Sequence, residues 1–197
     1  MTAIVLAAGM STRMGALKQL LPLKGRTLIE LAVEPLIGLV DRVCVVLGHR
    51  HEEVARALGD LPVECVLNPR YRDGMLTSVQ AGLYAAAEAA GYLLCLGDQP
   101  GLPPEAIAAV LAAAGRTGRG IVVPTCGGRR GHPVYLARRY RQEVLGLSAG
   151  QALRAVTRGH PADTLELEVG YPEVVEDVDT PEDYAAQACR RDWTERG

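Results

Sequence analysis

The chain has 197 residues, 48% of them hydrophobic, and 21 Lys and Arg residues nearly balance 23 Asp and Glu residues for a net charge of −2. This composition excludes an intrinsically disordered chain, and it offers neither the basic surface expected of a nucleic-acid-binding protein nor an apolar stretch of roughly 20 residues that would span a membrane. The length predicts one domain, 1–197, with a single sizeable core.

The first predicted strand, 3–8, leads into a loop of small residues that carries Gly9, Ser11 and Gly15. Because glycine has no Cβ, backbone N–H groups in such a loop can approach a ligand closely. Arg13 and Lys18 follow, and two cations beside such amides suit a polyphosphate. The segment therefore predicts a nucleotide site, with an ordinary loop carrying solvated cations as the alternative.

Two well-known phosphate loops do not match this segment. Five residues separate Gly9 from Gly15, and Ala16 stands where the Walker pattern requires Lys. Ser11 occupies the position of the second glycine in the dinucleotide pattern G-x-G-x-x-G. The loop is therefore neither of these two phosphate-binding types.

Strand-like and helical patterns alternate along the rest of the chain. Strands are predicted over 42–47, 63–67, 92–96 and 121–124, and helices over 27–36, 52–58, 77–90 and 104–114. The final third is less regular, with strands expected over 131–136 and 165–169 and helices over 151–158 and 181–191. This alternation predicts a three-layer α/β/α domain with a mostly parallel sheet, whose strand-end loops after Ala8, Leu67 and Leu96 converge on one cleft.

Asp98 follows the predicted strand 92–96, and a carboxylate at a strand end can hold Mg²⁺. The alternative is a helix cap, because Pro103 and Pro104 begin the next predicted helix. A second acidic cluster contains Asp177 and Asp179, which alternation places on the same side of an extended segment. There too a cap is the alternative, with Asp179 or Thr180 preceding a helix that begins at Pro181.

Two further loops carry polar side chains. Asn68 leaves the strand 63–67, and Thr77 or Ser78 opens the next predicted helix, where either hydroxyl could serve as its cap. Arg130 and His132 lie beside Gly131 in a loop that could grip an anionic co-substrate, although a lone His before Pro is usually structural.

The segment L-A-A-G-x-S-x-R-M-G-x-x-K-Q-L-L-P, residues 6–22, resembles the opening signature of the MobA-like NTP transferases and is most similar to the molybdenum cofactor cytidylyltransferase branch. Four later segments resemble the same family in order, so the resemblance spans nearly the whole chain: 68–78, 96–100, 130–135 and 177–183. It implies a nucleotide-diphospho-sugar transferase-like, Rossmann-like fold. It also implies Mg²⁺-dependent transfer of CMP from CTP to the phosphate of a molybdopterin-type cofactor, with release of pyrophosphate.

The resemblance implies roles for individual residues. Lys18, Arg13 and Asp98 would be catalytic, Asp98 and Asp179 would hold the metal, and Arg130 and His132 would face the acceptor. The nucleotide would lie against a larger set: Leu6, Ala7, Ala8, Gly9, Ser11, Arg13, Lys18, Asn68 and Ser78. Asp177 remains the alternative to Asp179.

Three other functions are alternatives to CMP transfer from CTP. GTP users of the family tend to carry glycine where Ala8 stands, so Ala8 favours CTP over GTP. A sugar-1-phosphate acceptor fits the R-G-H-P-V element, 130–134, less well. A non-catalytic nucleotide-binding module would need neither Asp98 nor Asp179.

Five scattered cysteines without a C-x-x-C pattern fit a reducing compartment, and the start of the chain has no charged region typical of a signal peptide. A cytoplasmic enzyme is therefore expected, without nucleic-acid or membrane partners. A molybdenum hydroxylase or its chaperone would be the recipient of the product. Cys44, Cys65 and Cys95 lie in strand-like runs and are predicted to be small core residues.

Overall fold

Strand β1 (Thr2–Ala7) is buried on both faces, as expected for the centre of a parallel sheet. The computed structural model describes residues 1–11, 14–148 and 150–190. Because successive side chains alternate across a strand, Ala3 and Val5 pack into the apolar cluster on one face and Ile4 packs into the cluster on the other. Two separate cores thus cover the two faces of the sheet.

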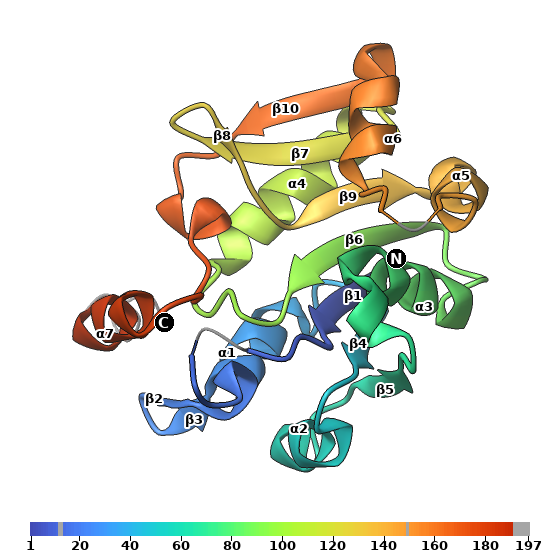
Figure 1. The fold of residues 1–197 in the computed structure, drawn as a ribbon. Helices are drawn as coiled ribbons and strands as arrows, with labels where there is room; N and C mark the ends of the chain where they lie inside the picture. Colours follow the sequence, from blue (N-terminus) through green and yellow to red (C-terminus); the bar gives the residue numbers. More distant parts are fainter. Residues whose placement is uncertain (12–13, 149, 191–197) are drawn as a thin grey trace.

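The main sheet has the strand order β10-β7-β9-β6-β1-β4-β5, with β8 (Arg129–Arg130) paired to β7. Its other strands are β4 (Arg42–Leu47), β5 (Glu64–Leu67), β6 (Gly91–Leu96), β7 (Ile121–Cys126), β9 (Val134–Ala137) and β10 (Thr164–Glu168). β9 runs antiparallel to β6 and β7, whereas β1 is parallel to both of its neighbours. Figure 1 shows β1 and β6 side by side between the edge strands β10 and β5.

Helices cover both faces of the sheet (Figure 1). α1 (Leu28–Val33), α2 (His51–Leu58) and α4 (Pro104–Thr117) bury apolar residues against one face. α3 (Met75–Ala85), α5 (Arg141–Leu145) and α6 (Arg154–Gly159) do so against the other. α7 (Pro181–Cys189) lies near the small hairpin of β2 (Pro22–Leu23) and β3 (Arg26–Thr27), where Tyr184 packs with Leu23. The predicted three-layer α/β/α domain with a mostly parallel sheet is confirmed.

Several predicted boundaries are wrong for identifiable reasons. The helix predicted over 77–90 begins at Met75 because Gly74, with φ of +108°, starts it, and it ends at Ala85. The helix predicted over 27–36 is α1 followed by a 3₁₀ turn, Glu34–Leu36, which contains Pro35. The strand predicted over 131–136 begins only at Val134, and the helix predicted over 151–158 begins only at Arg154.

Two further expectations concern single residues and the chain end. Cys65 is exposed on the edge strand β5 and is not a core residue, whereas Cys44 and Cys95 are buried as predicted. The helix predicted over 181–191 ends at Cys189, and residue 191 lies outside the described part of the chain. Among the described residues, no helix is both long and apolar enough to cross a membrane.

The order of the strands reverses on either side of β1, because the chain adds β4 and β5 on one side and β6 on the other. Ligands of open α/β sheets bind outside the carboxyl ends of the strands at such a switch point. Leu6 of β1 is in register with Leu96 of β6 and Val46 of β4, so the three strands end at the same edge. The loops that follow these strands build the candidate site.

Candidate active site

Gly97 places Asp98 at the end of β6. Its N–H donates to the carbonyl of Leu6 at 3.0 Å, and a Cβ on Gly97 would lie only 3.0 Å from both that carbonyl oxygen and the Cβ of Ala7. Any larger residue would therefore push the loop away from β1. Asp98 does not cap α4, whose cap is Pro103. The Asp98 Oδ1 atom is buried without a hydrogen-bond partner among the described residues, as expected of a carboxylate that awaits a ligand.

Thr180, and not Asp179, is the N-cap of α7. Its hydroxyl accepts from the N–H of Asp183, and the Asp183 carboxylate accepts from the N–H of Thr180, forming a capping box. The carboxylate of Asp179 is turned instead toward Lys18. The N–H of Val178 donates to the backbone carbonyl of Asp98 at 2.9 Å, which joins the two acidic segments.

Lys18 lies between the two carboxylates. Its ammonium donates to Asp179 Oδ1 at 2.8 Å and to Asp98 Oδ2, and its side chain is only 11% exposed. Burial lowers the pKa of Lys18, but the adjacent carboxylates outweigh that effect and raise it above 10.5. The ammonium therefore remains charged at neutral pH and holds together segments from both ends of the chain.

Asp177 lies on the same cavity as Asp98 and Asp179. Burial and the charges of Asp98 and Asp179 raise the pKa of Asp177. Among the described residues of the cavity, one ammonium thus faces three carboxyl groups, an arrangement that attracts a further cation.

The carboxylates fit a Mg²⁺ ion that is bound together with a substrate. Mg²⁺ is held through one or two carboxylates, with phosphate oxygens and waters completing its shell. Asp98 and Asp179 meet that requirement, and the unpartnered Oδ1 of Asp98 adds a buried acceptor. Among the described residues, no group of three or more His, Cys, Asp or Glu side chains could hold a metal ion, so phosphate oxygens and waters would have to supply the other ligands.

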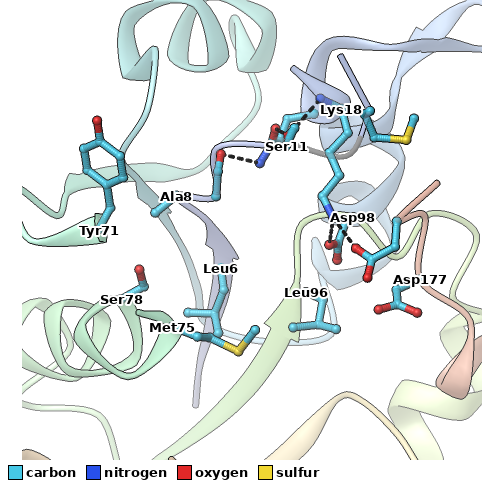
Figure 2. A pocket seen from close by; sticks show the side chains of 14 residues that line it. Leu6, Ala8, Ser11, Lys18, Tyr71, Met75, Ser78, Leu96, Asp98 and Asp177 are labelled. Atoms are coloured by element: carbon cyan, nitrogen blue, oxygen red, sulfur yellow. Dashed lines mark hydrogen bonds and ion pairs between the residues drawn. The ribbon is translucent and has the colours of Figure 1, made fainter. Parts of the chain in front are cut away.

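The cavity bordered by these groups has a volume of about 320 Å³, within the range of small-molecule sites. Figure 2 shows Asp98 and Asp177 on one side of it and Tyr71 and Ser78 on the other. Predicted nucleotide-site residues lining it are Leu6, Ala8, Gly9, Ser11, Lys18 and Ser78. Residues that sequence reasoning did not select also line it: Met14, Gln19, Tyr71, Met75 and Leu96.

Ser11 and Gln19 fix the loop after β1. Ser11 has a φ of +54°, a costly conformation for a residue other than glycine, and its hydroxyl accepts from the N–H of Lys18 at 3.1 Å. Gln19 is buried, and its amide donates to the carbonyl of Ala7 at 3.3 Å. Its place beside Lys18 in the signature is the signal that could have identified it. The predicted phosphate ligand Arg13 lies outside the described residues.

Asn68 and Ala7 are near the cavity but do not line it. Asn68 is buried, and its amide donates to the hydroxyls of Thr77 and Ser78, each at 2.9 Å. The cap of α3 is Gly74, so neither Thr77 nor Ser78 is the helix cap. Asn68 therefore positions Ser78, whose hydroxyl reaches the cavity, and Ala7 supplies only a carbonyl to the loop.

A second cavity of about 500 Å³ contains both residues predicted to face the acceptor, Arg130 and His132. Gly131 permits this loop to pass the 3₁₀ turn Pro172–Val175, because a Cβ on it would lie 1.9 Å from the carbonyl oxygen of Val174. Burial lowers the pKa of His132 to about 4, although Asp177 opposes the shift. His132 is therefore neutral at pH 7. Arg130 pairs with Glu166 through its Nε at 2.9 Å.

Comparisons with known proteins identify the family of the chain. Residues 3–165 match the family model described as MobA-like NTP transferase domain. The chain is 27% identical over 183 residues to the molybdenum cofactor cytidylyltransferase of Escherichia coli K12, with 92% of each chain covered. It is 34% identical over 191 residues to the nicotine blue oxidoreductase of Paenarthrobacter nicotinovorans, covering 92% of this chain and 93% of that protein.

The fold is also similar to that of a solved manganese complex, Rv0371C of Mycobacterium tuberculosis H37Rv. The TM-score is 0.79 with 26% identity, and the match covers 95% of this chain and 97% of that one.

Proposed function

This chain is a nucleotidyltransferase that belongs to the MobA-like NTP transferase family, and we propose that it transfers CMP from CTP to the phosphate of a molybdopterin-type cofactor. The proposal rests on the convergence of Lys18, Asp98 and Asp179 at one end of a nucleotide-sized cavity. The base would lie against Tyr71, Ser78 and Leu6, which line the same cavity away from this charged end. The likeness to a molybdenum cofactor cytidylyltransferase supports the choice of acceptor.

The reaction joins the acceptor phosphate to the nucleotide. An oxygen of that phosphate attacks the α-phosphorus of CTP, the bond from that phosphorus to the β-phosphate oxygen breaks, and pyrophosphate leaves. A phosphate monoester has a second pKa near 6, so the acceptor is already largely dianionic at neutral pH and needs no general base. The task of the protein is to position the reactants and to neutralise charge.

Asp98 and Asp179 would hold Mg²⁺, which supplies charge neutralisation for the triphosphate when bound. Lys18 is the described cation nearest to these carboxylates, and in this proposal its ammonium turns from them toward the α-phosphate. The loop held by Ser11 and Gln19 offers its backbone N–H groups to the phosphates. A similar protein was solved in complex with manganese. The activity with Mn²⁺ should therefore be compared with the activity with Mg²⁺.

We place this activity in the cytoplasm, because the described part of the chain has five free thiols, two of them exposed. The dinucleotide product would pass to a molybdenum hydroxylase or to its chaperone. Pull-down from a lysate supplied with CTP and acceptor, set against one without either, tests this transfer.

The activity is tested by measuring pyrophosphate release from CTP, GTP, ATP and UTP, each with and without molybdopterin-type cofactor and with Mg²⁺ or Mn²⁺. We expect release only with acceptor and metal, fastest with CTP, and a product whose mass equals acceptor plus CMP. Release with a sugar 1-phosphate in place of the cofactor would overturn the assigned acceptor. No release under any of these conditions would overturn the proposed function itself.

A second candidate function is redox conversion of a small organic molecule, which the 34% identity to a protein named as an oxidoreductase favours. The same protein preparation tests it through oxidation of NADH or NADPH in the presence of nicotine blue. The paired carboxylates around Lys18 support phosphoryl transfer instead, because they suit a metal ion bound together with phosphate groups. Hydride transfer does not require such a site.

A further inference from the structure

The two cavities form one continuous surface. Leu6 of β1 and Met75 at the start of α3 line both of them. A molecule seated in the second cavity can thus extend past these two side chains toward the charged end of the first. Such an arrangement suits an acceptor whose reacting group lies at the nucleotide and whose body lies some distance away.

The walls of the second cavity are mostly apolar. They come from α3, the adjacent strands β7, β9 and β6, and the segment before α6: Val79, Leu94, Val123, Val134 and Leu153. Apolar walls with a few polar groups are typical of small-molecule sites. Such walls suit the ring system of the acceptor named in the proposed function.

Three arginines line this apolar cavity, and they differ in their partners. Arg130 pairs with Glu166. Arg154 and Arg158 are exposed, and neither guanidinium has an ion-pair or hydrogen-bond partner among the described residues. Because these two lie four residues apart on α6, they share one helix face, where like charges repel. His132 is neutral at pH 7 and offers them no counter-charge.

We propose that Arg154 and Arg158 bind a second anionic group on the acceptor, remote from the phosphate that reacts, and so select planar heterocycles that carry two anionic groups. This inference rests on the proposed function for the identity of the reacting phosphate. Guanidinium groups bind planar anions through paired hydrogen bonds and also stack on flat rings. Arg154 and Arg158 line the cavity that does not contain Lys18 or Asp98, so in this proposal they act on acceptor binding and not on the transfer step.

The test uses the fluorescent probes pterin and 6-carboxypterin, which share a ring and differ by one carboxylate. Wild-type protein should bind 6-carboxypterin at least fivefold more tightly than pterin, and the double variant Arg154→Gln/Arg158→Gln should lose that preference. The control Arg116→Gln/Arg119→Gln removes the same charge around the end of α4, on the opposite face of the sheet. It should retain the preference, and all three proteins should bind CTP equally.

Steady-state kinetics separate this inference from the proposed function. The double variant should raise KM for the molybdopterin-type acceptor at least tenfold and leave KM for CTP and kcat within twofold. Transfer by the wild type with an unchanged acceptor KM in the variant would overturn the role of the arginines alone. Equal binding of the two probes by the wild type would overturn it too. Absence of any transfer, with the probe preference intact, would overturn only the proposed function.

Discussion

Lys18 and Asp179, 161 positions apart in the sequence, meet at 2.8 Å between ammonium Nζ and carboxylate Oδ1. The contact joins the loop after the first strand to the segment before α7, across the end of β6. With Asp98 bonded to the same ammonium, a protein cation occupies the position between two carboxylates that a divalent cation would otherwise share. In the proposed reaction, a metal–nucleotide complex bound at these carboxylates would displace Lys18 from them and make the lysine available to the phosphates.

Asp98→Asn should nearly abolish turnover while the fold survives. The amide keeps the shape of the carboxylate but loses the charge needed to hold a metal against phosphate oxygens. Weakening one metal ligand is expected to cost roughly 10²-fold or more in kcat. The measurement is pyrophosphate release at saturating Mg²⁺, alongside thermal unfolding. Asp60→Asn, a change at an exposed position after α2, serves as the matched control. Near wild-type activity in Asp98→Asn would remove Asp98 from the metal site.

Lys18→Ala should lower kcat by roughly 10²-fold, as expected for loss of one group that stabilises developing charge. Lys18→Arg should restore part of the rate, because it keeps the charge but cannot place it as compactly. Comparing pyrophosphate release by the two variants checks this order. Lys18→Ala also leaves Asp98 and Asp179 without their shared counter-charge, so tighter binding of Mn²⁺ in the absence of nucleotide is expected. Equal rates in all three proteins would make Lys18 purely structural.

Much of the site was predictable because parallel strands end at one edge of the sheet. The signature from Leu6 to Lys18 and the position of Asp98 after its strand were enough to place these residues on a common cavity. Alternation places Asp177 and Asp179 on one side of the chain and does not choose between them as metal ligands. The contact between the Asp179 carboxylate and Lys18 was not predictable, because it depends on Thr180 serving as the helix cap.

The second cavity was less predictable, because it is built from the irregular final third of the chain. Strand β9 inserts antiparallel between β6 and β7, and α6 and α3 pack on the same face of the sheet and line one cavity. No local sequence pattern around Arg154 or Arg158 predicts that α6 packs on this face of the sheet. The bonds from the Asn68 amide to Thr77 and Ser78 were also not predictable from the polarity of Asn68 alone.

Asp163→Asn should reduce stability at neutral pH without affecting the cavities. Burial raises the pKa of Asp163, but hydrogen bonds from Tyr140 and Arg139 and from the N–H of Gly120 outweigh it and lower the pKa to about 2. Since the folded-state pKa lies below the ordinary value of 3.8, this stabilisation is complete above about pH 4 and is lost as the pH falls toward 2. With the side chain 30% exposed, we expect a loss of about 1–2 kcal/mol at pH 7.

Urea unfolding of both proteins from pH 7 to pH 3 measures this effect. The difference in the free energy of unfolding between wild type and Asp163→Asn should be constant above pH 5 and should shrink below pH 4. A difference that stays constant to pH 3 would mean that packing, and not the charge of Asp163, accounts for the loss.

Ala8→Gly should weaken the preference for CTP over GTP. Ala8 is 5% exposed and lines the cavity where the chain leaves β1. The Ala8 methyl lies against the backbone of Gly48, where an added Cβ would be only 2.8 Å from it. Removing that methyl gives a purine more room, and a change of this size is worth about 1–3 kcal/mol of discrimination. The ratio of the guanylyl product to the cytidylyl product from an equimolar CTP and GTP mixture should therefore rise by roughly tenfold.

Ala112→Gly on the exposed side of α4 controls for the added backbone freedom of glycine. Preference of the wild type for GTP would overturn the cytidylyl assignment, and an unchanged product ratio in Ala8→Gly would move base selection to Tyr71 and Ser78 across the cavity.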